Sequence, residues 1–169
     1  MFIKFNFDSK KYLENINNNV TKKIVKSIDT KFMTKTGEIL ADDIARRTRL
    51  GFGVKKSGQT RVKLRELTPK YVDFRKKNKK KLINLTRPSK SNLTFTGQLL
   101  NSLKAKSDGT GRVTIFFKGD HKNLDGSKMK NGLLANFVSK KRPFLGPSNR
   151  ELQRLRTRIK NNILKSLNV

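Results

Sequence analysis

Two stretches of this sequence contain residues whose types and spacing could support chemistry. The segment Gly53–Thr60, GVKKSGQT, has the glycine spacing of a phosphate-cradling loop, but Gln59 stands where that loop needs a lysine to reach the phosphates. Residues Asp120, His121 and Asp125 could offer metal ligands from one short loop, but such ligands need supporting residues to hold an ion. We interpret both stretches as solvent-exposed turns.

The composition excludes several other kinds of site. The chain has no cysteine and one histidine, which rules out thiolate zinc sites, iron–sulfur clusters and cysteine nucleophiles. The adjacent acids Asp42 and Asp43 lie in a predicted helix, where neighbouring side chains diverge, so they cannot act as a catalytic carboxylate pair. We therefore expect no enzyme, no catalytic residue, no metal and no cofactor.

Positive charge is the most pronounced property of the sequence. Lysine and arginine number 41 against 12 acids, which gives a net charge of +29. No acid lies between Asp73 and Asp108, whereas ten basic residues fall there, Lys104 and Lys106 included. We predict that eight of the ten face DNA or a partner. These candidates are Arg75, Lys76, Lys77, Lys79, Lys80, Lys81, Arg87 and Lys90. Such a field attracts phosphate backbones in a salt-sensitive way, although the same lysines could simply solvate a helix face.

Length and hydropathy limit the organisation of the chain. A sequence of 169 residues corresponds to a single domain, here 1–169. The longest run without a charged side chain, Ser91–Leu103, has 13 residues, which is too short for a membrane-spanning helix. The first seven residues are interrupted by Lys4 and do not resemble a secretory signal. We expect a protein of a cytoplasm-like compartment with no membrane partner.

Apolar periodicity predicts the helices. Leu13 to Phe32 reads as one long amphipathic helix within a helical arm 1–35, and a second helix follows Thr36–Gly37. Thr68–Pro69 is a suitable helix start. Ser148 and Glu151 form the capping box of a C-terminal helix.

The remaining segments predict one small sheet and two loops. Residues 112–118, RVTIFFK, have the composition of a strand. Residues 51–66 read as a basic flexible loop and residues 119–131 as a charged loop. The expected fold is α+β, with a long N-terminal amphipathic helix, further helices packed on one small, mainly antiparallel sheet, and a C-terminal helix.

Two short motifs occur in a defined order. The first, TGxLxxS, consists of Thr96, Gly97, Leu99 and Ser102, and the second, RPFLG, of Arg142, Pro143, Phe144, Leu145 and Gly146. Together with the upstream LTPKY, they resemble the tail-completion or virion-morphogenesis (head–tail joining, neck) proteins of tailed bacteriophages. In that family the first motif starts a short helix, and the second is a strand that leads into the C-terminal helix. The Tyr-Ala pair and the His or Glu that often precede the second motif are absent from GLLANFVSK, residues 132–140.

The resemblance implies a structural role in the virion. It points to a head–tail connector subunit that forms a homo-oligomeric ring around the DNA exit channel, with tail-axis symmetry favouring six copies over twelve. The implied partners are portal or adaptor proteins, tail proteins and nearby packaged double-stranded DNA. The implied location is the neck or tail of the virion, and the host cytoplasm during assembly. The alternative is a free-standing basic protein that binds nucleic acid nonspecifically, since no sequence-reading motif is visible.

Overall fold

The structure is a computed structural model, and it describes residues 3–6, 18–55, 59–81, 87–91, 93, 96–109, 111–123 and 125–167. The helices are α2 (Asn18–Ser27), α3 (Thr30–Arg49), α4 (Pro69–Lys77), the 3-10 helix η1 (Lys79–Lys81), α5 (Gln98–Asn101), α6 (Asn131–Lys141) and α7 (Asn149–Leu167). The strands are β1 (Ile3–Asn6), β2 (Phe52–Val54), β3 (Arg61–Lys63), β4 (Leu103–Ser107), β5 (Arg112–Phe117), β6 (Asp120–Lys122) and β7 (Lys128–Lys130).

These elements form an α+β fold, as the sequence predicts. The described strands form one three-stranded sheet in the order β1-β5-β4 and two hairpins, β2-β3 and β6-β7, and every pairing is antiparallel. The strand predicted over 112–118 is confirmed as β5, which pairs with β1 on one side and β4 on the other. The largest sheet thus has β5 at its centre.

The core lies between α3 and this sheet. Helix α3 buries Met33, Leu40 and Ile44, and these side chains belong to the same apolar cluster as Val113 and Ile115 of β5. Leu155 and Ile159 of α7 join the cluster from another side. One continuous apolar core therefore joins the two longest helices to the sheet.

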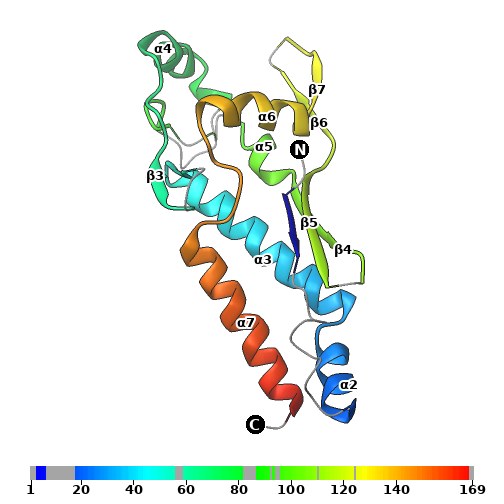
Figure 1. Cartoon of the computed structure of the whole chain (residues 1–169). Coiled ribbons are helices and arrows are strands. Elements are labelled where there is room, and N and C mark those ends of the chain that lie inside the picture. Colours follow the sequence, from blue (N-terminus) through cyan, green and yellow to red (C-terminus); the bar gives the residue numbers. More distant parts are fainter. Residues whose placement is uncertain are drawn as a thin grey trace.

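The molecule is elongated, with a helical stem and a broader end (Figure 1). In the stem, α3 and α7 lie side by side, and α2 packs against α7 at the end that holds the C-terminus. The opposite end is formed by α4, α6 and the β6-β7 hairpin. Most of the basic residues predicted to face DNA belong to α4, η1 and the segment that follows them, at this broader end.

The N-terminal helices differ from the prediction in their boundaries. The break falls between α2 and α3, where the Asp29 carboxylate accepts a hydrogen bond from Phe32 N at 2.7 Å and caps α3. The predicted boundary at Thr36–Gly37 is wrong, because Gly37 is buried inside α3 and lies against Val113 and Ala105. The helical interpretation of 1–35 is also wrong for residues 3–6, which form β1, while residues 7–17 lie outside the described part.

The two predicted loops contain short hairpins. In 51–66, β2 pairs with β3, Leu64 is buried, and Val54 N donates to Pro143 O at 2.9 Å. In 119–131, β6 pairs with β7. Each strand has three residues, and the exposed-intermediate-exposed pattern of β3, β6 and β7 leaves their charged side chains in solvent. Backbone hydrogen bonds between the paired strands stabilise these segments. Such bonds cannot be recognised from a charged amino-acid sequence.

Candidate nucleic-acid interface

The lysine-rich segment, residues 76–81, comprises the end of α4 and the short helix η1. As predicted, Thr68 caps α4, since its hydroxyl accepts from Tyr71 N, and Pro69 occupies the first turn. The last turn contains Arg75, Lys76 and Lys77, where the partial negative charge of the helix terminus favours cations. The aromatic residues Tyr71 and Phe74 of α4 are exposed and lie outside the core.

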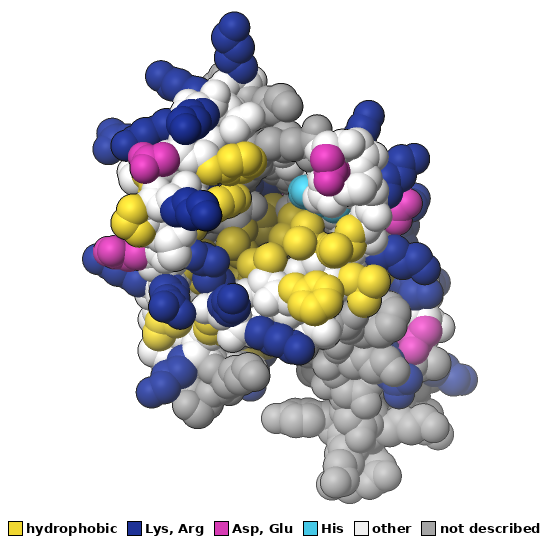
Figure 2. Space-filling view, turned by 90° about the horizontal axis from the view of Figure 1, so that it is seen from above, with side chains coloured by type: hydrophobic (Ala, Val, Ile, Leu, Met, Phe, Trp, Pro, Cys, Tyr) yellow, Lys and Arg dark blue, Asp and Glu magenta, His cyan; other side chains and the backbone are white. Residues whose placement is uncertain are grey.

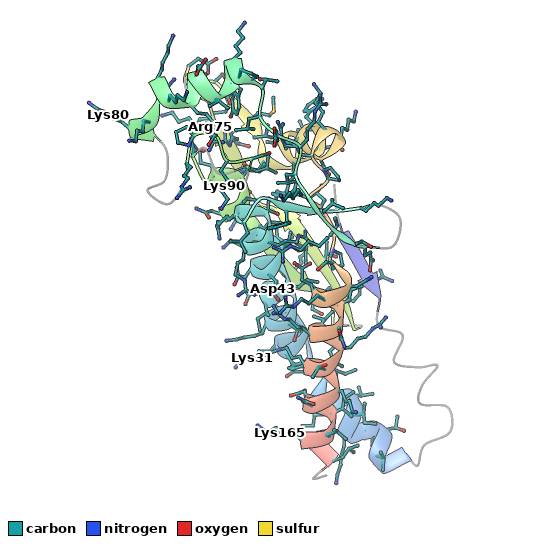
Figure 3. The ribbon with its side chains drawn as sticks, turned by 90° about the vertical axis from the view of Figure 1, so that its left-hand side faces the viewer. Lys31, Asp43, Arg75, Lys80, Lys90 and Lys165 are labelled. Carbon is teal, nitrogen blue, oxygen red and sulfur yellow. The ribbon has the colours of Figure 1, made fainter. Side chains whose placement is uncertain are left out.

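Arg75 does not face DNA or a partner at the surface, contrary to the prediction. Its side chain is 2% exposed, and Nη1 donates to the Lys90 carbonyl at 2.8 Å. Burial lowers the pKa of Arg75, and the nearby Tyr71 opposes this effect. Figure 3 shows Arg75 on the inner side of α4 near Lys90, whereas Lys80 extends away from the molecule. Arg75 therefore fastens α4 to the segment 87–91.

Five of the other candidates have side chains exposed to solvent. The exposed ones are Lys76, Lys77, Lys79, Lys80 and Arg87, whereas Lys90 is half-buried. Lys81 lies in η1, and its side chain is outside the described part. Lys76 Nζ lies 3.3 Å from Asp73 Oδ1, but both side chains are more than 60% exposed, so solvent screens this pair.

Exposed cations are not confined to this end. Lys104 and Lys106 point outward from β4, and Arg156, Lys160 and Lys165 line the solvent face of α7. Figure 3 shows Lys31 and Lys165 directed into solvent along the stem. The positive field is therefore distributed over the molecule, an arrangement suited to phosphate contacts and not to reading bases.

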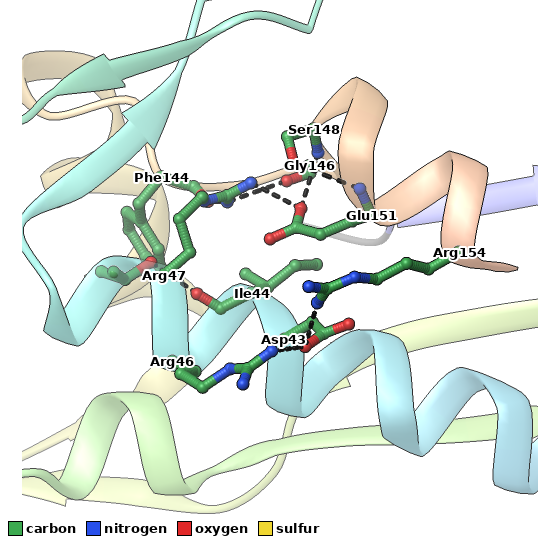
Figure 4. A network of polar contacts seen from close by, with 10 residues as sticks. Asp43, Ile44, Arg46, Arg47, Phe144, Gly146, Ser148, Glu151 and Arg154 are labelled. Atoms are coloured by element: carbon green, nitrogen blue, oxygen red, sulfur yellow. Dashed lines mark hydrogen bonds and ion pairs between the residues drawn. The ribbon is translucent and has the colours of Figure 1, made fainter.

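Several acids already have partners. Asp43 pairs with Arg46 and Arg154, at 2.5 Å and 3.5 Å, and Asp108 lies 3.9 Å from Arg112. Figure 4 shows Asp43 between the two arginines. The few carboxylates thus neutralise individual side chains and leave most of the cationic surface to an external counter-charge.

The TGxLxxS motif forms the turn into β4. Gly97 has φ +74° and precedes α5, which confirms the predicted helix start. Thr96 is half-buried and Leu99 is buried in the core. The Ser102 hydroxyl donates to Leu99 O at 2.7 Å, and Ser102 O accepts from Lys118 N at 2.8 Å. These positions build local structure.

The RPFLG motif does not form a strand, so its prediction as a strand is wrong. Only one backbone bond, Val54 N to Pro143 O, joins it to a described strand. Phe144 is fully buried, with its ring edge-on to Phe117 at 6.2 Å, and Leu145 is half-buried. Arg142 donates from Nε to Arg65 O at 3.2 Å. The motif packs between neighbouring segments and is not part of a ladder.

A buried ion pair beside this motif has no counterpart in the prediction. Arg47 Nη1 donates to Glu151 Oε2 at 2.7 Å, and Arg47 Nη2 donates to the carbonyls of Phe144 and Gly146 (Figure 4). Burial lowers the pKa of Arg47, and Glu151 opposes that shift. Glu151 could be identified from its capping box, whereas no local pattern links it to a residue 104 positions away.

In the described parts of the two stretches considered first for chemistry, the side chains do not form an assembled site. Gly53 lies in β2, and residues 56–58 are outside the description. Asp125 accepts from the hydroxyl and backbone amide of Ser127, and both hydrogen bonds lower its pKa. Within the described ranges no group of three histidine, aspartate or glutamate side chains could hold a metal ion.

Comparison with known proteins returns no relative. No protein-family model, no curated protein and no solved structure matches this chain. Of the helices described, none is both long and apolar enough to cross a membrane.

Proposed function

We propose that this chain is a structural virion protein of a tailed phage, a tail-completion or head–tail connector subunit in a ring around the DNA exit channel. The observation that carries the proposal is the exposed, distributed cationic surface, which includes lysines of α4, β4 and α7. Copies of a chain with net charge +29 repel one another unless phosphates or acidic neighbours compensate them. A channel filled with DNA supplies that compensation.

The two resembling motifs support the same proposal. The motifs occur in the same order as in the family. Both have a structural role, because Gly97 precedes α5 with a left-handed backbone conformation and Phe144 is buried in the core. This is consistent with a protein that acts by its shape and charge and assembles with portal or adaptor and tail proteins.

The alternative is a free-standing protein that binds nucleic acid nonspecifically, and the same surface favours it. The two candidates differ in what the isolated chain does. A free-standing binder holds duplex DNA tightly as a monomer, with an affinity that falls steeply with salt. A ring subunit binds DNA weakly as a monomer and gains affinity when copies assemble, because their contacts add.

Solution mass and DNA binding, measured together on the purified chain, separate these candidates. We expect weak DNA binding at dilute, monomeric concentrations and stronger binding where native mass spectrometry detects oligomers. Tight, salt-sensitive binding by a chain that stays monomeric at every concentration would contradict the ring and support the alternative.

A further inference from the structure

We propose that the hollow between α4 and α6 is a docking site for an acidic, apolar-faced segment of another protein. The hollow has a volume of about 560 Å³. Its apolar lining comes from Leu67, Tyr71, Leu93, Leu99, Leu134 and Val138. Figure 2 shows hydrophobic side chains on its floor and walls and the histidine at its edge. The volume falls within the roughly 300–1,000 Å³ range of binding pockets, which is sufficient for apolar side chains of a partner.

Apolar surface continues beyond the hollow on both of its walls. On α4, Tyr71 and Phe74 stack with ring centroids 5.9 Å apart, and each is about 40% exposed. On α6, Leu133 and Phe137 are more than half exposed and directly precede the lining residues Leu134 and Val138. Exposed apolar side chains that gather around a hollow indicate a protein interaction site. The adjoining surface suits a chain segment better than a compact small molecule.

The charges around the hollow are unbalanced. The cations of its lining that reach solvent are Arg65, Lys141 and Arg142, against one acid, Glu66, whereas Arg75 is buried. Arg142 donates to the carbonyls of Arg65 and Glu66 and to the Ser91 hydroxyl, which are neutral acceptors. Carboxylates beside the apolar side chains of a partner would complement these cations.

The charges and the apolar lining of the hollow together indicate which kind of molecule binds there. A second copy of this chain brings 41 basic residues and 12 acids, and its adjacent acids Asp42 and Asp43 lie on α3, whose apolar face is in the core. Nucleic acid supplies phosphates but no aliphatic side chains for the floor. An acidic protein segment with leucine or aromatic residues supplies both features. This inference rests on the hollow alone and holds whether or not the chain forms a ring.

Fluorescence titration tests this docking directly, because the chain contains no tryptophan. The probe is a short synthetic peptide with leucines, aspartates and one tryptophan, added to the full chain. The matched peptide keeps the aspartates and the tryptophan and replaces the leucines with serine, which isolates plain charge attraction. We expect the leucine peptide to bind at least roughly tenfold more tightly than the serine peptide.

Variants of the hollow, each with a matched control elsewhere, test whether the peptide binds in the hollow. Lys141→Glu at the rim is matched by Lys160→Glu on the exposed face of α7, since the charge change is the same. Tyr71→Ser in the wall is matched by Val25→Ser, an exposed apolar residue of α2. We expect each hollow variant to weaken the leucine peptide roughly tenfold and each control to leave it unchanged. Circular dichroism verifies that all four variants are folded.

Three results would overturn the proposal. The first is equal binding of the leucine and serine peptides. The second is equal loss of affinity in the hollow variants and their controls. The third is binding of duplex DNA or anionic phospholipid vesicles, and not of the peptide, in a way that Tyr71→Ser and Lys141→Glu weaken. The peptide titration needs no assembled particle, so its failure is distinguishable from failure of the proposed virion role.

Discussion

Arg47 near the end of α3 and Glu151 in the first turn of α7 form an ion pair in which the side chains are only 5% and 7% exposed. The same carboxylate oxygen accepts from Ser148 N at 2.6 Å, and so completes the cap of α7. The second guanidinium nitrogen of Arg47 holds the carbonyls of Phe144 and Gly146. One buried pair thus joins the long helix, the RPFLG segment and the C-terminal helix.

Removing the cation of this pair should destabilise the protein strongly. Arg47→Met leaves the Glu151 carboxylate buried without its counter-charge, and we expect the free energy of unfolding to fall by about 3–5 kcal/mol. Urea denaturation measures the change. Lys76→Met, which breaks the exposed pair with Asp73, is the control and should cost at most about 1 kcal/mol. Similar small losses of stability for both variants would show that the buried pair does not join the helices.

Gly37 should resist substitution although it lies in a helix. A Cβ at this position would be 2.4 Å from Val113 Cγ1 and 2.9 Å from Ala105 Cβ. Alanine improves helix propensity by about 1 kcal/mol, but overpacking costs about 1–3 kcal/mol, so we expect Gly37→Ala to be neutral to destabilising. Adding Val113→Ala should cost less in the Gly37→Ala background than in the wild type, a coupling that a double-mutant cycle of denaturation energies measures. Strictly additive effects would contradict the close contact.

Phe144 should be one of the costliest residues to truncate. It is fully buried and packs edge-on against Phe117. Phe144→Ala should lower the free energy of unfolding by about 3–5 kcal/mol, because the core cannot refill the space of a phenyl ring. Chemical denaturation measures this, and a decrease below about 1 kcal/mol would place the side chain outside the core.

His121 should make stability depend on pH. Burial lowers its pKa below the ordinary value of 6.5, so the unfolded chain binds this proton at higher pH than the folded chain. Stability should therefore be lost as the pH falls below 6.5 and through the folded pKa. His121→Gln should remove this part of the loss between about pH 7 and about pH 5, above the ordinary carboxyl range. Unfolding curves at both pH values measure it, and an unchanged pH dependence would contradict the burial effect.

The basic residues of α4 and η1 should divide into two classes. Replacing Lys76, Lys77, Lys79 and Lys80 together by glutamine should leave folding intact and weaken duplex DNA binding, with a salt slope smaller by about 0.9 for each phosphate that is no longer neutralised. Arg75→Gln should instead lower thermal stability, because its buried guanidinium holds the Lys90 carbonyl. Fluorescence anisotropy at several salt concentrations and thermal melts measure the two effects. Unfolding of the lysine variant would place these side chains in the core.

Local patterns predicted the features whose partners are close in sequence. The Ser148–Glu151 box and the Thr68 cap depend on residues three positions apart, and both form as expected. Strand β5 was visible from its β-branched and aromatic residues. The α+β class could be predicted, because these local patterns indicate which segments are helices and which are strands.

The features that depend on distant partners could not be predicted. Gly37 resembled a helix boundary, because glycine occurs both where helices break and where elements pack closely. Only its close approach to Val113, which is distant in sequence, shows that it serves close packing. Arg75 resembled its exposed neighbours, since its burial depends on the segment that contains Lys90. The hairpins have strands of three residues, too short for alternation to be visible. At the candidate interface, composition revealed the charge but not the apolar hollow beside it.

The measurement that tests the central claim most directly is the content of purified tailed particles from cells that produce this chain. Quantitative mass spectrometry with electron microscopy of the neck should find the chain in stoichiometric amount, in a ring at the head–tail junction with six copies. Particles that contain none of it, while the chain persists in the cell as a stable monomer, would contradict the account.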